Sequence, residues 1–156
     1  MNVDLTDLRH KAKDALFVGV TFAHKQLYTR SGGRIAGSVG PTKFLILTST
    51  GRKSGQPRET MLNYGVDGEN LVLVASFGGD ARHPQWYRNL EADPEVSVRI
   101  GTETRRMKAH TATPEEKPRL WSLMTEGAGS QRGYKGYSHY QHWTEREIPV
   151  IVLSPA

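Results

Sequence analysis

The spacing of apolar residues near the N-terminus predicts a long amphipathic helix over residues 4–29. Intervals of three and four residues, the period of one helical face, separate Leu5, Leu8, Ala12, Ala15, Gly19 and Phe22, and Ala23 lies four residues after Gly19. The same segment is rich in basic residues. Packing against the rest of the fold is the simplest interpretation of the apolar face. Peripheral contact of residues 1–24 with an anionic membrane surface is the sharper hypothesis.

After a glycine-rich loop at residues 31–42, the pattern changes to that of strands. The expected strands are 43–50, 59–66, 70–76, 95–100, 103–111 and 148–153. Asp67-Gly68 predicts a hairpin between the second and third strands. The continuous apolar run at 71–75 predicts a strand that is buried on both faces. The more polar strand 103–111 is expected at a sheet edge.

Two helices are expected between these strands. Residues 84–90 predict a short helix that closes before Asp93-Pro94. Thr113 and Glu116 form a capping box, with Pro114 at the first helical position of a helix that runs to about residue 126. Six strands in hairpins with helices between them predict a small α+β barrel, and the length of the chain predicts one domain over residues 1–156.

Composition narrows the expected partners. The 156 residues carry a formal net charge of +5 and no cysteine. A basic protein favours an acidic partner such as a polyanionic cofactor, a nucleic acid or an anionic membrane surface. The absence of cysteine excludes disulfides and thiolate chemistry. No segment approaches the ~20 apolar residues of a spanning helix, and charges interrupt any signal-peptide core, so a cytoplasmic location is expected.

The stretch 48–58 is the first candidate site. It places Arg52, Lys53 and Arg58 around Gly51 and Gly55, directly after an apolar strand. Glycines allow backbone shapes that turn amide groups toward an anion, and the cations add charge at the same place. A solvated basic hairpin turn is the alternative. The Walker A spacing and the dinucleotide-binding glycine fingerprint are both missing, so neither standard nucleotide site is predicted.

The stretch 76–80, Ser-Phe-Gly-Gly-Asp, ends the apolar strand and is the second candidate. Its two glycines let the backbone approach a flat ligand closely, and Ser76 could hydrogen-bond that ligand. An ordinary turn from strand to helix is the alternative.

The third candidate is an aromatic stripe at every third position, formed by Tyr134, Tyr137 and Tyr140 with Trp143 next in phase. Phenols suit an aromatic substrate pocket and proton donation, and the flanking glycines predict a lid. Packing on the core is the alternative. His139 and His142 have the spacing of two metal ligands but no third ligand, so no metal site is predicted.

Four motifs in order carry a resemblance to a known family. They are Gly-Arg-Lys-Ser-Gly-Gln-Pro-Arg, Ala-Ser-x-Gly-Gly, Pro-Gln-Trp-Tyr-Arg-Asn-Leu-Glu-Ala-Asp-Pro and Tyr-x-x-Tyr-x-x-Tyr-x-x-Trp. Over residues 25–156 the sequence resembles the deazaflavin (F420)-dependent nitroreductase and quinone reductase family of actinobacteria. The resemblance implies a split β-barrel related to the FMN-binding barrels, here residues 43–156 with the tyrosine-rich lid. It also implies coenzyme F420, a deazaflavin with a phospholactyl and polyglutamate tail, as the cofactor.

The resemblance also implies roles for individual residues. The cofactor phosphate would meet the basic loop, here Thr50, Gly51, Arg52, Lys53, Ser54, Gln56, Pro57 and Arg58. The deazaflavin ring would lie along Ala75, Ser76, Gly78 and Gly79, flanked by Trp86, Tyr87 and Asn89. The substrate pocket would contain Asn63, Tyr64, Tyr134, Tyr137 and Tyr140, and Ser76 or one of the three last tyrosines would polarise the acceptor or relay a proton.

The expected function is hydride transfer from reduced deazaflavin to a small acceptor: a quinone, an activated enone or a nitroaromatic. Asn63 stands where a well-known nitroreductase member has tyrosine, so the resemblance does not support reduction of bulky nitroimidazole prodrugs. Phe77 replaces a commonly basic residue, which bears on contacts with the cofactor tail. The alternatives are an FMN-dependent oxidoreductase of the same barrel type, a basic barrel that binds nucleic acid, and a cofactor carrier without catalysis. No nucleic-acid partner is expected on the favoured interpretation, and the oligomeric state is left open.

Overall fold

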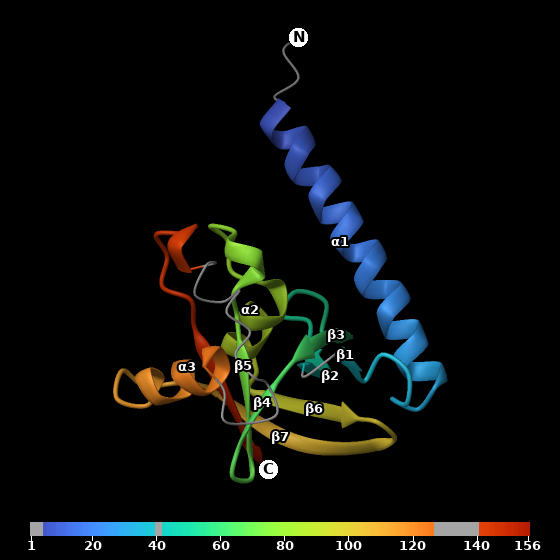
Figure 1. Cartoon of the computed structure of the whole chain (residues 1–156), viewed down its shortest axis with the longest axis vertical. Helices are drawn as coiled ribbons and strands as arrows, with labels where there is room; N and C mark the ends of the chain where they lie inside the picture. The colour runs from blue at the N-terminus through green and yellow to red at the C-terminus, as the bar shows by residue number, and fades with distance from the viewer. Residues whose placement is uncertain (1–4, 40–41, 127–140) are drawn as a thin grey trace.

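The computed structural model describes residues 5–39, 42–126 and 141–156 (Figure 1). The helices are α1 (Leu5–Arg30), α2 (Gln85–Ala92) and α3 (Lys117–Thr125), with a 3-10 turn, η1 (Phe77–Gly79). The strands are β1 (Ser38–Val39), β2 (Thr42–Thr50), β3 (Pro57–Asn63), β4 (Gly65–Asp67), β5 (Asn70–Val74), β6 (Glu95–Ile100), β7 (Glu103–Thr111) and β8 (Val150–Pro155).

The strands of the described residues form one curled antiparallel sheet, so the predicted α+β barrel is confirmed. Their order is β1-β2-β6-β7-β8-β5-β4, and β3 pairs with β2 outside this path. There are eight described strands where six were predicted. One addition is β1, and the other arises because the predicted strand 59–66 breaks at Tyr64 into β3 and β4. A side chain at Gly65 would approach the Met124 sulfur to 2.6 Å, so this break lets α3 pack closely.

The predicted edge position of residues 103–111 is wrong, because β7 lies between β6 and β8. The strand is polar for a different reason. Met107 and Ala109 face the core, whereas the alternate residues Arg106, Lys108 and His110 are exposed. A central antiparallel strand with one solvated face has this alternation.

Among the described residues, three groups of buried side chains hold the fold together. The largest lies inside the curl and includes Leu45, Leu73 and Trp86. A second lies between β5, β8 and α3 and includes Val72 and Met124. Residues of β5 contribute to both groups, which confirms the prediction that this strand is buried on both faces. The two hydrogen bonds of the predicted capping box form, since the Thr113 amide donates to the Glu116 carboxylate at 2.9 Å and the Glu116 amide to the Thr113 hydroxyl at 3.3 Å. The predicted helix start is wrong, because residues 114–116 form a turn and α3 begins at Lys117, so Pro114 is not its first helical residue.

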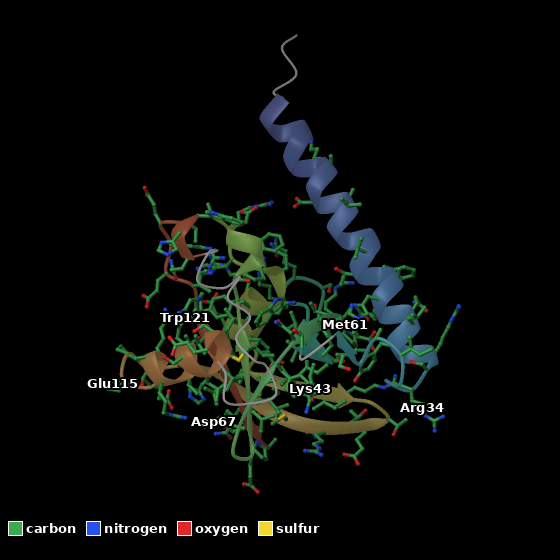
Figure 2. All side chains as sticks on the ribbon, in the orientation of Figure 1. Arg34, Lys43, Met61, Asp67, Glu115 and Trp121 are labelled. Carbon is green, nitrogen blue, oxygen red and sulfur yellow. The ribbon has the colours of Figure 1, made fainter. Side chains whose placement is uncertain are left out.

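The third group joins α1 to the barrel through the end of the helix. Tyr28 is 1% exposed and packs with Ile46 and Met61 on the outer face of β2 and β3. Its hydroxyl accepts a hydrogen bond from the Gly101 amide at 2.6 Å. Figure 1 shows the N-terminal half of α1 standing clear of the strands. In Figure 2, Arg34 after α1 and Trp121 on α3 mark opposite sides of the molecule.

Before Tyr28, the described side chains of α1 that contact the barrel side are polar, and several apolar ones are exposed. Asp14 approaches Arg82 at 3.5 Å, and Lys25 pairs with Glu59 at 2.7 Å. The exposed apolar side chains are Leu16, Val18, Val20, Phe22 and Leu27, each more than half exposed. Within the described residues, no helix is both long and apolar enough to cross a membrane. The helix therefore packs against the barrel through Tyr28, as expected, but not through the exposed apolar side chains named above.

The Tyr28 hydroxyl generates a prediction about stability. Tyr28→Phe leaves the Gly101 amide without its acceptor, which should lower the free energy of unfolding by about 1–3 kcal/mol. Tyr87→Phe is the matched control, because the hydrogen bond of the Tyr87 hydroxyl among the described residues is to the hydroxyl of the exposed Thr111, at 3.3 Å. Water can replace that bond, so its loss should cost less. Urea unfolding of both variants measures the difference, and equal midpoints would show that the Tyr28 bond does not fasten α1.

Candidate functional site

The loop between β2 and β3 is closed by its own backbone. The Gly51 amide donates to the Gln56 carbonyl at 2.8 Å, and the Gly55 amide donates to the Gly51 carbonyl at 2.7 Å. Gly55 has a φ of 67°, a conformation that favours glycine. A side chain at Gly51 would approach the Ser54 hydroxyl to 2.7 Å. Both glycines are therefore required by the turn that presents the basic side chains.

The three cations of this loop have only neutral hydrogen-bond partners in the described residues. The Arg52 guanidinium donates to the Asn89 side-chain oxygen at 3.1 Å and to the Gln85 side-chain oxygen at 2.8 Å. Arg58 donates to the Ser54 hydroxyl at 3.3 Å, and Lys53 is exposed. None of the three forms an ion pair with a carboxylate in that part of the chain. Their charge is therefore not cancelled, and the loop can attract an anion.

Asn89 fixes this loop against α2. The side chain is 5% exposed, and its oxygen accepts from both the backbone amide and the guanidinium of Arg52. Its amide nitrogen donates to the Ser49 hydroxyl at 3.5 Å. The neighbouring Trp86 and Tyr87 are each 7% exposed and belong to the main core. The predicted role of these three residues as flanks of a cofactor stays a prediction, and the geometry gives Asn89 a role in holding Arg52.

The segment 75–80 continues β5 into an unusual turn. The Ala75 amide donates to the Pro149 carbonyl at 3.0 Å, and Ser76 is 7% exposed. Phe77 has a φ of 47°, which is disfavoured for a residue with a side chain. The amide of Gly79 donates to the Ser76 carbonyl at 3.1 Å. The guanidinium of Arg82 lies 5.4 Å from the centre of the Phe77 ring.

Sequence reasoning missed Arg146, which lies directly behind this turn. Its guanidinium donates to the Ser76 carbonyl at 2.7 Å, to the Ala75 carbonyl at 3.2 Å and to the Asp80 carbonyl at 2.9 Å. The remaining nitrogen lies 3.3 Å from Nδ1 of His83. In the sequence, Arg146 looks like one of several charges in a polar connection, so spacing alone could not have identified it.

The beginning of α2 connects the two loops. Gln85 contacts Arg52 of the first loop, and His83, two residues earlier, contacts Arg146 behind the second. The structure therefore brings together the predicted residues of the stretches 50–58, 75–79 and 86–89. Side chains around this junction offer hydrogen-bond donors, positive charge and the hydroxyl of the buried Ser76, which suit a ligand with an anionic group and a polar ring.

Other predicted site residues lie elsewhere. Asn63 pairs with Phe44 at one end of β2, while Pro57 pairs with Thr50 at the other, so six ladder steps, about 20 Å, separate Asn63 from the basic loop. Tyr64 is buried in the main core, and burial is the main cause that raises the pKa of its phenol. Their role in a substrate pocket stays a prediction. Tyr134, Tyr137 and Tyr140 lie outside the described residues.

His83 generates a prediction about pH. Burial, and then the Arg146 charge, lower the pKa of the His83 imidazole below its ordinary value near 6.5. A lowered folded-state pKa means that neutral His83 stabilises the fold fully above pH ~6.5, and that this contribution is lost as the pH falls further. Because Arg146 donates to Nδ1, the proton of the neutral ring is assigned to Nε2.

His83→Asn should therefore flatten the pH dependence of stability, because an amide oxygen can accept from Arg146 without titrating. We expect the difference in melting temperature between pH 7.5 and pH 5 to be smaller in this variant than in the original chain. His142→Asn, a change at an exposed histidine, is the control and should leave that difference unchanged. If His83→Asn and the original chain have parallel profiles, His83 does not titrate with folding.

Comparison with known proteins identifies the family. The family model of the F420H(2)-dependent quinone reductases matches residues 21–155. An F420H(2)-dependent quinone reductase of Mycobacterium tuberculosis is 38% identical over 134 residues, which cover 84% of this chain and 87% of the relative. A putative F420H(2)-dependent quinone reductase of the same species is 39% identical over 120 residues, which cover 77% of this chain and 96% of that one.

Solved structures agree with these sequence relatives. An F420-H2 dependent reductase is 36% identical, has a TM-score of 0.63, and the match covers 71% of this chain and 93% of that one. A structure described as a domain-swapped dimer is 30% identical with a TM-score of 0.64, covering 90% of this chain and 99% of that one. The resemblance carried by the four motifs is confirmed: the chain belongs to the F420H(2)-dependent quinone reductase family.

Proposed function

We propose that this chain is an F420-dependent oxidoreductase that reduces a small electron-poor acceptor, most readily a quinone and otherwise an activated enone or a nitroaromatic. The observation that carries the proposal is the junction at the start of α2. There, a loop with three uncancelled cations meets a buried serine turn, in a member of a family named for F420H(2)-dependent quinone reduction. The reduced coenzyme, when bound, supplies the hydride.

The residues of the chain fit this cofactor. Lys53 and Arg58 are exposed cations that would bind the anionic tail, and Arg52 adds charge while it holds the loop against α2. Ala75, Ser76, Gly78 and Gly79 would provide the surface on which the ring lies. Charge-assisted contacts of this kind are the stronger hydrogen bonds in proteins. The basic loop therefore supplies affinity, and the turn supplies orientation.

Proton delivery is the second task of the site. An acceptor that takes a hydride at carbon must also gain a proton. Ser76 is buried, and its hydroxyl could donate a hydrogen bond to the acceptor. Tyr134, Tyr137 and Tyr140 are the further candidates, since a phenol with a pKa near 10 is protonated at neutral pH. Their predicted place over the acceptor rests on the sequence motif.

The basic loop gives a direct test of the proposal. Titration of the protein with coenzyme F420, followed by fluorescence, should show saturable binding, and FMN should bind more weakly. Lys53→Ala and Arg58→Ala should each weaken F420 binding by about tenfold to a hundredfold, because each removes a charge-assisted contact of roughly 1.5–3 kcal/mol. Arg52 is a poorer choice for this test, since its loss would also release Asn89.

Lys43→Ala is the matched control, because Lys43 is an exposed cation at the opposite end of β2 and should not change affinity. Turnover with menadione and reduced F420 then measures the reaction itself. Tight binding of FMN without binding of F420 would show that the cofactor is FMN and not F420. Unchanged F420 affinity in both loop variants would show that the anionic tail of F420 does not bind to this loop.

We further propose that α1 makes the peripheral membrane contact predicted from residues 1–24. Leu16, Val20 and Leu27 are 71%, 62% and 52% exposed, on a helix whose described side chains that contact the barrel side before Tyr28 are polar. The segment also carries Arg9, Lys11 and Lys13, which complement anionic lipid. A quinone acceptor is itself lipid-soluble, so a helix lying in the membrane interface would bring the barrel to its substrate.

Val20→Glu tests this contact, because a charge on the exposed apolar side should reduce co-sedimentation with phosphatidylglycerol vesicles by several-fold. Val66→Glu, at an exposed valine on β4, should leave it unchanged. Turnover of soluble menadione should be unaffected in both variants. Failure of the original chain to bind the vesicles would refute the proposal. Sedimentation velocity adds the competing outcome: a dimer that Val20→Glu dissociates would assign the surface to a second copy of the chain. One similar solved structure is described as a domain-swapped dimer.

A further inference from the structure

Arg146 is a half-buried cation whose hydrogen bonds all go to neutral groups in the described residues. Three of its four partners are the carbonyl oxygens of Ala75, Ser76 and Asp80, and the fourth is the His83 ring. The neighbouring carboxylate, that of Glu147, forms its ion pair with Lys117, at 2.6 Å. Burial lowers the pKa of the Arg146 guanidinium from its ordinary value, but an arginine stays charged at neutral pH.

The segment before β8 is itself braced so that Arg146 has a fixed direction. The Gln141 side chain donates to the Arg146 carbonyl at 2.9 Å and accepts from the Ile148 amide at 3.1 Å. The Arg146 amide contacts the Thr144 hydroxyl at 3.4 Å. These hydrogen bonds hold the backbone on both sides of Arg146. The Arg146 guanidinium then points at the turn after β5.

Three carbonyl dipoles directed at one point repel each other unless a cation lies between them. The described chain has no cis peptide bonds, so each peptide group points its N–H away from its C=O. With the Ala75 and Ser76 carbonyls directed at Arg146, the amides of Ser76 and Phe77 point to the opposite side of the turn. The positive φ of Phe77 belongs to the same arrangement, which the guanidinium stabilises.

We propose that Arg146 is a positioning residue for the cofactor. It holds the turn 75–80 in the shape that presents the Ser76 and Phe77 amides to the polar edge of the deazaflavin ring. Its charge, placed behind the two peptide groups, strengthens them as donors. This inference rests on the proposed function, and it divides the binding site into two parts: the basic loop holds the anionic tail, and the turn backed by Arg146 holds the ring.

The division predicts that variants of the two parts respond differently to two probes, coenzyme F420 and the deazaflavin ring compound that lacks the phosphate tail. Arg146→Gln should weaken binding of both probes by a similar factor, about tenfold to a hundredfold, the scale of a lost charge-assisted contact. Lys53→Ala should weaken only the probe with the tail. The absorbance maximum of the bound ring should also shift in Arg146→Gln and not in Lys53→Ala, because only the former changes the charge beside the ring.

Arg146→Lys separates positioning from charge and from simple stability. Lysine keeps the charge but cannot fork to three carbonyls, so it should fold and still lose most of the ring affinity. Arg119→Gln, which removes an arginine paired with Asp67 on the α3 side, is the control and should bind both probes normally. Circular dichroism verifies folding of each variant.

Each outcome decides between the hypotheses. If the original chain binds neither probe, the proposed function fails and not this inference alone. If the original chain binds F420 and a folded Arg146→Gln binds the ring probe equally well, the inference is overturned. If Arg146→Gln does not fold, Arg146→Lys decides: normal ring binding overturns the inference, and loss of ring binding in the folded protein supports it.

Discussion

The buried side chain of Asn89 is the constraint on which the basic loop depends. A buried amide without partners would cost about 1–3 kcal/mol or more, so this one must find both donors and acceptors near by. It does so by accepting from the backbone and the guanidinium of Arg52 and by donating to Ser49. These bonds fix the loop at its first residue, and the glycines at 51 and 55 then set its path. The loop is therefore an extension of the core rather than an independent surface hairpin.

The same logic explains why two loops far apart in sequence form one site. The first loop follows β2 and the second follows β5, and these two strands are not neighbours in the sheet. The residues just before and at the start of α2 make the connection, because Gln85 holds Arg52 and His83 meets Arg146. A helix packed on the core through Trp86 and Leu90 is a rigid link. Relative movement of the two loops would require breaking the hydrogen bonds that each makes to this helix and to the residues just before it, so the fold sets the spacing between the tail-binding and ring-binding parts.

Much of the fold could be predicted from the sequence because local patterns decide it. The bounds of β6 and β7, the hairpin after Asp67 and the capping box before α3 follow from alternation and turn chemistry. The central position of β7 could not be predicted, because a central strand with one solvent-exposed face and an edge strand have the same pattern of polar residues. Next to the break at Tyr64, Gly65 leaves room for the Met124 sulfur, and such a contact between residues distant in sequence leaves no local pattern.

The residues of the candidate site also fall into those that the sequence identifies and those that it does not. Arg52, Lys53, Arg58 and the glycines form a local motif, so the sequence identifies them. Arg146 acts through backbone carbonyls some 70 positions away. Carbonyls are present at every residue and leave no trace in a sequence pattern. Only the fold brings the arginine and its acceptors together, and so it could not be found from spacing.

The choice of hydrogen-bond partners separates the arginines of the candidate site from four others in the described chain. Arg82, Arg88, Arg105 and Arg119 pair with carboxylates. Arg52, Arg58 and Arg146 are held by amide, hydroxyl and carbonyl oxygens and an imidazole. A carboxylate would fix an arginine but cancel its field, whereas a neutral acceptor fixes the geometry and leaves the charge. A site for an anionic ligand needs both properties at once, and neutral acceptors are the means by which the fold provides them.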